Sequence, residues 1–282
     1  MSRNSLRLCH ATPGRFAAIA LVLFAADAHA EIIINPLSWG LNPGDTFRLV
    51  VVTAGGTTGT STTIAAYDTF VNSQGLSGIT VNGASLTWQA IGLTPSSDPL
   101  TDASRFSSQA NASRTYNLNG ALVSNTTNGT AFWKTSGGNQ HLAAIDWTIN
   151  GSGNAAQVNS FQAVWTGFDF DGTVARATDY DEFGSPVGQV TAALGQSVNY
   201  NSYDFETGQL VPQTLYPFLG RAGALANGWA AFDNLDPTTV RPLYAMSELI
   251  TVAAVPEPST YCMALAGLAC GGYLVRRRRK RA

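Results

Sequence analysis

The sequence predicts a single β-rich domain with at least one helix, and three observations support this. Only 12% of the 282 residues are charged, and Gly, Ser, Thr and Asn are abundant. Short apolar runs are separated by turn-forming residues, as is typical of strands joined by turns. Residues 31–253 contain no repeat of fixed period and no second domain boundary, and this length is sufficient for one hydrophobic core.

The clearest elements lie in the first half of the domain. Residues 47–53 are nearly all apolar and predict a buried strand. Residues 62–73 predict a helix, because Ile64, Tyr67 and Phe70 recur at helical spacing. A threonine at the start of this segment can cap the helix.

The remaining elements are shorter. Residues 86–91 predict a second strand, and residues 94–113 predict a loop. The later segments that predict a strand, some with an adjoining turn, are 115–120, 163–167, 228–233 and 242–248.

The order of aromatic residues and turn residues along the domain forms a pattern that can be compared with known folds. After the first strand, this pattern comprises Tyr67, Phe70, residues 88–91, residues 116–120, Phe132-Trp133, residues 164–167, Asp171-Gly172, Trp229 and residues 243–247. The pattern resembles the endostatin-like branch of the C-type lectin-like fold, over most of residues 44–252. The resemblance implies an α+β fold with twisted antiparallel strands, one or two helices and long loops.

The chain departs from the better-known members of that fold at their functional positions. Their disulfides are missing, because Cys9, Cys262 and Cys270 all lie outside residues 31–253. The Glu-Pro-Asn or Gln-Pro-Asp motif that holds calcium and sugar in true lectins is absent, and the zinc-binding histidines have no counterpart. The resemblance therefore implies a fold and carries no ligand with it.

Charge and residue counts exclude several functions. Residues 31–256 hold seven Lys or Arg and sixteen Asp or Glu, a net charge of 7 − 16 = −9. An acidic domain repels phosphates, so we expect no nucleic-acid partner. His141 is the only histidine in this region, which excludes a His/Cys zinc site, and the missing cysteines exclude a thiol nucleophile.

Carboxylates concentrate between residues 169 and 182. Asp169, Asp171, Asp179 and Asp181 are candidate calcium ligands, because Asp-Phe-Asp-Gly places two carboxylates on a tight turn. The full twelve-residue calcium-loop pattern is absent. The alternative is a solvated turn in which Asp and Gly serve the backbone geometry. No other cofactor is expected.

Other polar and aromatic residues are weaker candidates. Asp146 and Asp233 are possible carboxylates for glycoside hydrolysis, which needs two facing carboxyl groups. His141 has no nucleophile signature nearby and is predicted to be a surface residue. The tryptophans divide into a predicted core set of Trp88, Trp165 and Trp229 and a predicted exposed pair of Trp133 and Trp147, which would suit stacking on sugars.

The N-terminal residues 1–30 predict a signal peptide. Three arginines precede the apolar run of residues 16–26. Ala28-His29-Ala30 is a small-x-small cleavage site, so the mature chain is expected to begin at Glu31.

Residues 254–282 combine three signals in order. Val255-Pro256-Glu257-Pro258 precedes fifteen uncharged residues, Tyr261 to Val275, and the basic run follows. A helix of this length spans roughly 22 Å, which is short for a permanent membrane anchor. The basic run keeps the terminus in the cytoplasm and consists of Arg276, Arg277, Arg278, Arg279, Lys280 and Arg281.

This tail resembles the PEP-CTERM sorting signal of exported bacterial proteins. The resemblance implies a membrane intermediate with a single transmembrane helix, processing by an exosortase, and delivery to the cell surface or extracellular matrix. We expect a non-enzymatic protein that contacts polysaccharide. The alternatives are a secreted hydrolase acting on extracellular polysaccharide and a purely structural matrix component.

Overall fold

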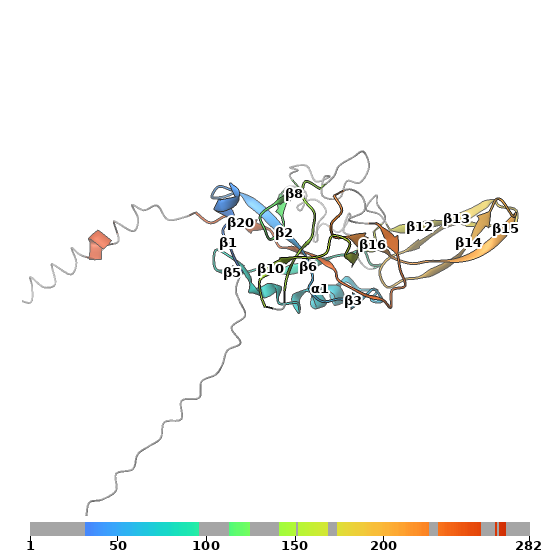
Figure 1. Cartoon of the computed structure of the whole chain (residues 1–282), viewed down its shortest axis with the longest axis horizontal. Coiled ribbons are helices and arrows are strands. Elements are labelled where there is room, and N and C mark those ends of the chain that lie inside the picture. The colour runs from blue at the N-terminus through green and yellow to red at the C-terminus, as the bar shows by residue number, and fades with distance from the viewer. Residues whose placement is uncertain are drawn as a thin grey trace, which may run out of the picture.

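The computed structural model describes residues 32–95, 113–124, 141–150, 152–168, 174–225, 231–254, 263 and 265–268. Within them, a body of short strands and a helix carries an arm of two long hairpins that projects from one side (Figure 1). The described part is mostly β with few helices, which confirms the predicted class at that level.

A six-stranded sheet forms the centre of the body. Five of its strands follow the order β6-β19-β2-β7-β8, and β20 also pairs with β2. The central strand pairs antiparallel with β19 and parallel with β7. The strands are β2 (Thr46–Val52), β6 (Trp88–Ile91), β7 (Arg114–Tyr116), β8 (Leu122–Ser124), β19 (Tyr244–Ser247) and β20 (Ile250–Thr251).

Both faces of β2 are buried. Phe47, Leu49 and Val51 pack into one hydrophobic cluster, whereas Val50 and Val52 pack into a second cluster on the other face. Successive side chains of a strand point to opposite faces, so a strand buried on both sides needs a continuous apolar run. This explains the pattern of residues 47–53 and confirms the prediction of a buried strand.

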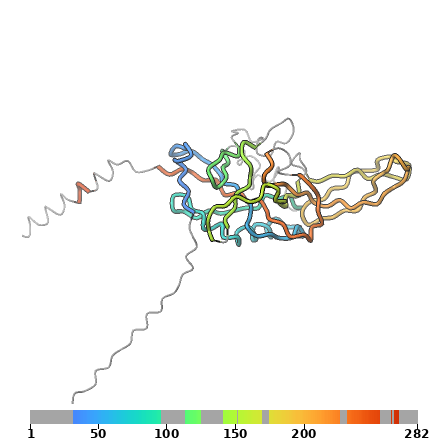
Figure 2. The backbone as a smooth tube through the Cα atoms, in the orientation of Figure 1, coloured from blue at the N-terminus to red at the C-terminus, as the bar shows by residue number. Residues whose placement is uncertain are grey.

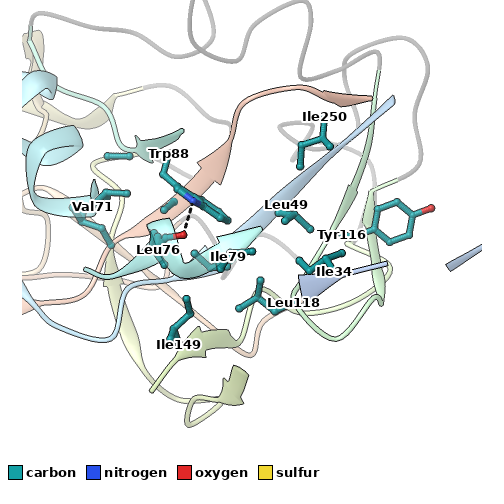
Figure 3. Packing of buried hydrophobic residues seen from close by; sticks show 14 of the residues in the cluster. Ile34, Leu49, Val71, Leu76, Ile79, Trp88, Tyr116, Leu118, Ile149 and Ile250 are labelled. Carbon is teal, nitrogen blue, oxygen red and sulfur yellow. Dashed lines mark hydrogen bonds between the residues drawn. The ribbon is translucent and has the colours of Figure 1, made fainter. Parts of the chain in front are cut away.

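The first cluster is closed by the helix and by the turns around it (Figure 3). Trp88 lies almost fully buried there, and its indole Nε1 donates a hydrogen bond to the carbonyl oxygen of Leu76 at 3.2 Å. A buried indole needs such a partner for its N–H group. The predicted core position of Trp88 is confirmed.

Helix α1 (Ile64–Asn72) lies within the predicted range and buries Ile64, Tyr67 and Val71. Thr63 is its N-cap residue, but the Thr63 side chain makes no capping hydrogen bond. The Tyr67 hydroxyl instead fixes the chain before the helix, since it donates to the carbonyl oxygen of Ser61 at 3.0 Å. Burial raises the pKa of Tyr67 to about 12, while the hydrogen bond with Ser61 acts in the opposite direction.

Smaller elements complete the body. The 3-10 helices are η1 (Pro36–Trp39) and η2 (Leu76–Gly78). The remaining body strands form small sheets and are β1 (Ile32–Ile34), β3 (Thr57–Thr58), β4 (Ile79–Val81), β5 (Ala84–Ser85), β9 (Trp147–Ile149), β10 (Ala155–Gln157), β11 (Ala163–Trp165), β16 (Phe218–Arg221), β17 (Asp233–Asn234) and β18 (Val240–Arg241).

The predicted elements agree with these bounds to different degrees. Strands are found within 86–91, 163–167 and 242–248, and β7 with its turn corresponds to 115–120. Of the predicted strand 228–233, only its end is described, where β17 begins. Most of the predicted loop 94–113 lies outside the described residues.

No helix among the described residues is long and apolar enough to cross a membrane. The predicted span from Tyr261 to Val275 lies largely outside the described residues. Met263 and residues 265–268 are described, and they are helical and exposed. The single transmembrane helix therefore stays a prediction, as does the signal peptide of residues 1–30.

Candidate functional site

The projecting arm, residues 175–215, is the most distinctive feature of the domain (Figures 1 and 2). One hairpin consists of β12 (Ala175–Tyr180) and β13 (Pro186–Ala192), and the other of β14 (Val198–Asp204) and β15 (Gln209–Leu215). Each hairpin forms its own two-stranded antiparallel sheet. The hairpins bind to each other through Asp179 of β12, whose Oδ1 accepts a hydrogen bond from the backbone N–H of Asn201 in β14 at 2.8 Å.

The arm is fixed to the body at its root. Between the two hairpins, the backbone N–H of Leu194 donates to the carbonyl oxygen of Leu93 at 2.9 Å, and that of Gly195 donates to Gly59 at 2.6 Å. Leu194 is fully buried in the first core cluster. A small cluster of Ala175, Ala192 and Leu215 fills the base of the arm. The arm is thus a rigidly rooted projection.

Asp residues and glycines build the turns at the far end of the arm. Asp181 Oδ1 accepts the backbone N–H groups of Phe183 and Ser185, and Gly184 adopts a left-handed conformation with φ of 74°. In the second turn, Asp204 Oδ1 accepts a hydrogen bond from the backbone N–H of Glu206. Short polar side chains and glycine are what such turns require.

Asp204 is further bound by Thr207, whose hydroxyl donates to Asp204 Oδ2 at 2.7 Å. This hydroxyl, followed by the backbone N–H groups of Glu206 and Thr207, holds the pKa of Asp204 below its usual value. Asp204 therefore stays ionised in mildly acidic and neutral conditions, and its negative charge lies at the far end of the arm.

The two turns meet in an aromatic cluster, which we call the tip. Tyr203 and Phe205 have ring centroids 5.0 Å apart, and Tyr180 lies 6.2 Å from Phe205. Phe205 is 75% exposed, and Phe183 in the neighbouring turn is 79% exposed. Large apolar rings in contact with water at the end of a projection are unusual on a monomer and indicate a binding surface.

A hollow of about 320 Å³ opens on the arm where β12, β14 and β15 contribute its lining. Its lining is dominated by amide, hydroxyl and carboxylate groups, which donate and accept hydrogen bonds. Thr214 and Asn199 already pair across β14 and β15, with the Thr214 hydroxyl 2.9 Å from Asn199 Oδ1. The lining residues are Asp179, Asn199, Tyr200, Asn201, Pro212, Gln213 and Thr214.

A second hollow of about 440 Å³ lies on the body, next to the end of β2. Its walls mix the apolar side chains of Val52, Val158 and Val240 with the guanidinium of Arg241. None of its described lining residues is aromatic, whereas the arm carries the exposed rings of Phe183 and Phe205 in addition to its polar hollow.

The predicted calcium ligands divide into two pairs. Asp169 and Asp171 lie outside the described residues. Asp179 is part of β12 and Asp181 begins the following turn, so these two carboxylates belong to a hairpin instead of one acidic loop. Among the described residues, no group of three or more His, Cys, Asp or Glu side chains is arranged to hold a metal. The calcium site stays a prediction.

Calcium binding is testable through stability. We expect calcium to leave the melting temperature of the domain unchanged, because Asp179 and Asp181 already accept backbone hydrogen bonds. A thermal melt with calcium and with a chelator measures this. A reproducible rise with calcium, lost in Asp171→Asn, would instead establish a calcium site in residues 169–182.

The other candidate residues are dispersed. The Asp146 carboxylate is buried and accepts a hydrogen bond from the Gln157 amide at 2.6 Å, whereas Asp233 lies exposed in β17. Burial, with a smaller contribution from Asp146, raises the pKa of Tyr244 well above its usual value. The prediction of a surface His141 is wrong: its side chain is 3% exposed, and its backbone N–H donates to the carbonyl oxygen of Leu225 at 2.6 Å.

The described tryptophans follow the predictions in the core set but not in the exposed pair. Trp165, like Trp88, is fully buried. Trp147 is half-buried and packs against the first core cluster, so it is not the open ring that was expected. Trp133 and Trp229 lie outside the described residues. The exposed aromatic rings of the domain include phenylalanines of the arm, which the sequence argument did not select.

Residues 254–280 match the PEP-CTERM protein-sorting motif. This confirms the predicted sorting tail, although its Val255-Pro256-Glu257-Pro258 motif and the basic run 276–281 lie outside the described residues. The PEP-CTERM motif indicates an exported protein that is targeted by exosortase and sorted to the cell surface. No curated protein and no solved structure matches the chain.

The PEP-CTERM tail leads to a prediction about the mature protein. We expect the surface form to lack Arg276–Arg281, because processing near the Pro-Glu-Pro motif removes everything that follows it. Mass spectrometry of the C-terminal peptide from surface-released protein measures this, and the membrane-bound precursor serves as the control. A surface form that retains the basic run would contradict sorting by this tail.

Proposed function

We propose that this exported protein is a non-enzymatic surface or matrix component whose arm contacts extracellular polysaccharide. The observation that carries the proposal is that one arm holds both a hollow lined by amides, a hydroxyl and a carboxylate and, in its turns, the exposed aromatic rings of Phe183 and Phe205. Sugars present hydroxyl groups along their edges and apolar C–H groups on their faces. A surface that combines hydrogen-bonding groups with aromatic rings matches both.

The position of the arm supports the same proposal. The root anchors the hairpins to the core, while both turns lie at the end farthest from the body (Figure 2). A projecting, rooted surface reaches a polymer without requiring the body to approach it. The resemblance of the ectodomain to the C-type lectin-like fold stays a prediction, and this proposal does not depend on it.

The test is a glycan array probed with the full chain in detergent, with and without calcium. We expect binding to polysaccharide fragments that is independent of calcium. Asn201→Ala and Asn199→Ala should each weaken binding about five- to tenfold, the effect of losing one hydrogen bond. Asn154→Ala, an exposed amide on the body, is the matched control and should bind normally.

Binding to no glycan at all would overturn the proposal and favour a purely structural component. Binding that survives both arm substitutions would place the sugar site elsewhere on the domain. Binding that requires calcium would direct attention to residues 169–182 instead of the hollow.

A further inference from the structure

Four residues that line the hollow, Asn199, Asn201, Pro212 and Thr214, share one strand face with residues at the tip. Side chains alternate between the two faces of a strand, so Asn199, Asn201 and Tyr203 share one face of β14. The register places Thr214, Pro212 and Leu210 of β15 directly opposite them. Phe205 follows at the turn and contacts Tyr203. We call this surface the strip.

The strip has the dimensions of a site for an extended chain. From residue 199 to residue 205 it runs for about 20 Å, at about 3.3 Å per residue. Its first half presents amides and a hydroxyl, and its second half presents aromatic rings. This sequence of groups suits several consecutive units of a linear polymer and exceeds what a single small ligand would occupy.

The arm is strongly acidic along this surface. It holds the five carboxylates Asp179, Asp181, Glu182, Asp204 and Glu206 and only one cation, Arg176. All five carboxylates lie toward the tip, whereas Arg176 is in the second position of β12, near the root. A negative field of this kind attracts cations and repels anionic polymers.

The carboxylates of Glu182 and Glu206 differ from the others in that they do not shape the turns. Asp181 and Asp204 accept the hydrogen bonds that shape the two turns. Glu182 and Glu206 are exposed residues of the same turns, and no hydrogen bond to their carboxylates shapes either turn. Their charges therefore face the solvent around the aromatic cluster.

We infer that the strip binds a linear polysaccharide that carries protonated amino groups. This inference rests on the proposed function and adds the chemical class of the ligand. The aromatic rings stack on the apolar faces of the sugar rings, and the exposed carboxylates pair with the ammonium groups. A basic peptide would satisfy the charges, whereas an amino sugar chain also offers hydroxyl groups to the amides of the strip and apolar ring faces to its aromatic side chains.

The experiment compares immobilised polymers that differ in charge, using the full chain in detergent at mildly acidic pH and low salt. The probes are chitosan, which is cationic, its fully acetylated neutral counterpart chitin, and alginate, which is anionic. Polylysine is included as a cationic polymer without sugar. We expect chitosan to bind at least tenfold more tightly than the other three, and salt to weaken this binding.

Single variants separate charge from stacking. Glu182→Gln and Glu206→Gln should each weaken chitosan binding about two- to fivefold, as expected for an exposed ion pair, and leave chitin binding unchanged. Phe205→Ala should weaken both about tenfold, since stacking does not depend on the amine. Asp233→Asn removes one charge from the body and should leave binding unaffected.

Each other outcome is decisive. Equal binding of chitosan and chitin overturns the inference and leaves polysaccharide binding intact. Tight binding of polylysine that matches chitosan overturns it in favour of a basic protein partner. Binding to no polysaccharide overturns the proposed function as well, and preference for alginate contradicts the charge argument directly.

Discussion

Replacing Trp165 by alanine is expected to lower the free energy of unfolding by about 3–5 kcal/mol, the usual cost of removing a large buried aromatic side chain. Trp165 is fully buried and lies at the end of β11, inside the first core cluster. The loss includes the apolar area and the cavity that remains, because the surrounding backbone cannot collapse freely into the space.

The indole also connects segments that are far apart in the sequence. Its Nε1 lies 3.2 Å from the carbonyl oxygens of both Thr57 in β3 and Thr239 just before β18, so one donor serves two distant segments. Gly59 packs so closely on the ring that an added Cβ would come within 3.0 Å of it. The ring therefore positions the chain just before α1 as well as filling the core.

Urea unfolding of residues 31–254, followed by circular dichroism, measures the effect. Trp165→Phe keeps most of the ring but leaves the two carbonyl groups without their donor, and should cost about 1–3 kcal/mol. Phe183→Ala, an exposed ring on the arm, is the control and should change stability by less than about 0.5 kcal/mol. Equal unfolding midpoints for Trp165→Ala and the control would show that the body does not depend on this residue.

The central strand and the helix were predictable because each has a local sequence pattern that only one type of secondary structure explains. A strand with both faces covered must be apolar at every position, and residues 47–52 are so except for Arg48. The Arg48 side chain is accommodated by donating to the carbonyl oxygen of Ser247 at 2.7 Å. Burial lowers its pKa, while Glu248 acts in the opposite direction. The helix shows its buried face at helical spacing in Ile64, Tyr67 and Val71.

The arm was not predicted, because its strands lack that signal. Most side chains of β13, β14 and β15 are exposed or half-buried, so no hydrophobic alternation marks them. Turn signals were present, in Asp181 with Gly184 and Asp204 with Gly208, and both glycines have a positive φ. If these Asp and Gly residues had been interpreted as hairpin turns, Asp179 would have been assigned to a strand and Asp181 to the turn that follows it.

The candidate site depends on tertiary arrangement that no local pattern contains. Asp179 and Asn201 are 22 positions apart and meet only because the second hairpin packs against the first. His141 was placed on the surface because its sequence neighbours are polar, yet its side chain is buried and its backbone N–H donates to the carbonyl oxygen of Leu225, 84 positions away. The sorting motif of residues 254–280 was predictable because its signals are contiguous in the sequence and need no fold.

Replacing Gly195 by alanine is expected to destabilise the domain by about 2–4 kcal/mol, combining backbone strain with steric overlap. Gly195 has φ of 82°, which a residue with a Cβ adopts at a cost. An added Cβ would also overlap the carbonyl oxygen of Ser61, which is backbone and cannot rotate away. The hydrogen bond from Gly195 to Gly59 would then be lost or lengthened.

Because Gly195 stands between the two hairpins, its replacement should affect the orientation of the arm before the rest of the body. Hydrogen exchange measures this directly, as faster exchange of the Leu194 and Gly195 amides, and chemical unfolding measures the total loss. Gly188→Ala is the matched control, since Gly188 lies in β13 with no atom near its missing Cβ. That variant should retain the stability of the original chain. If both alanine variants unfolded alike, the root would be more compliant than its contacts indicate, and the arm would reach a polymer as a hinged projection instead of a fixed one.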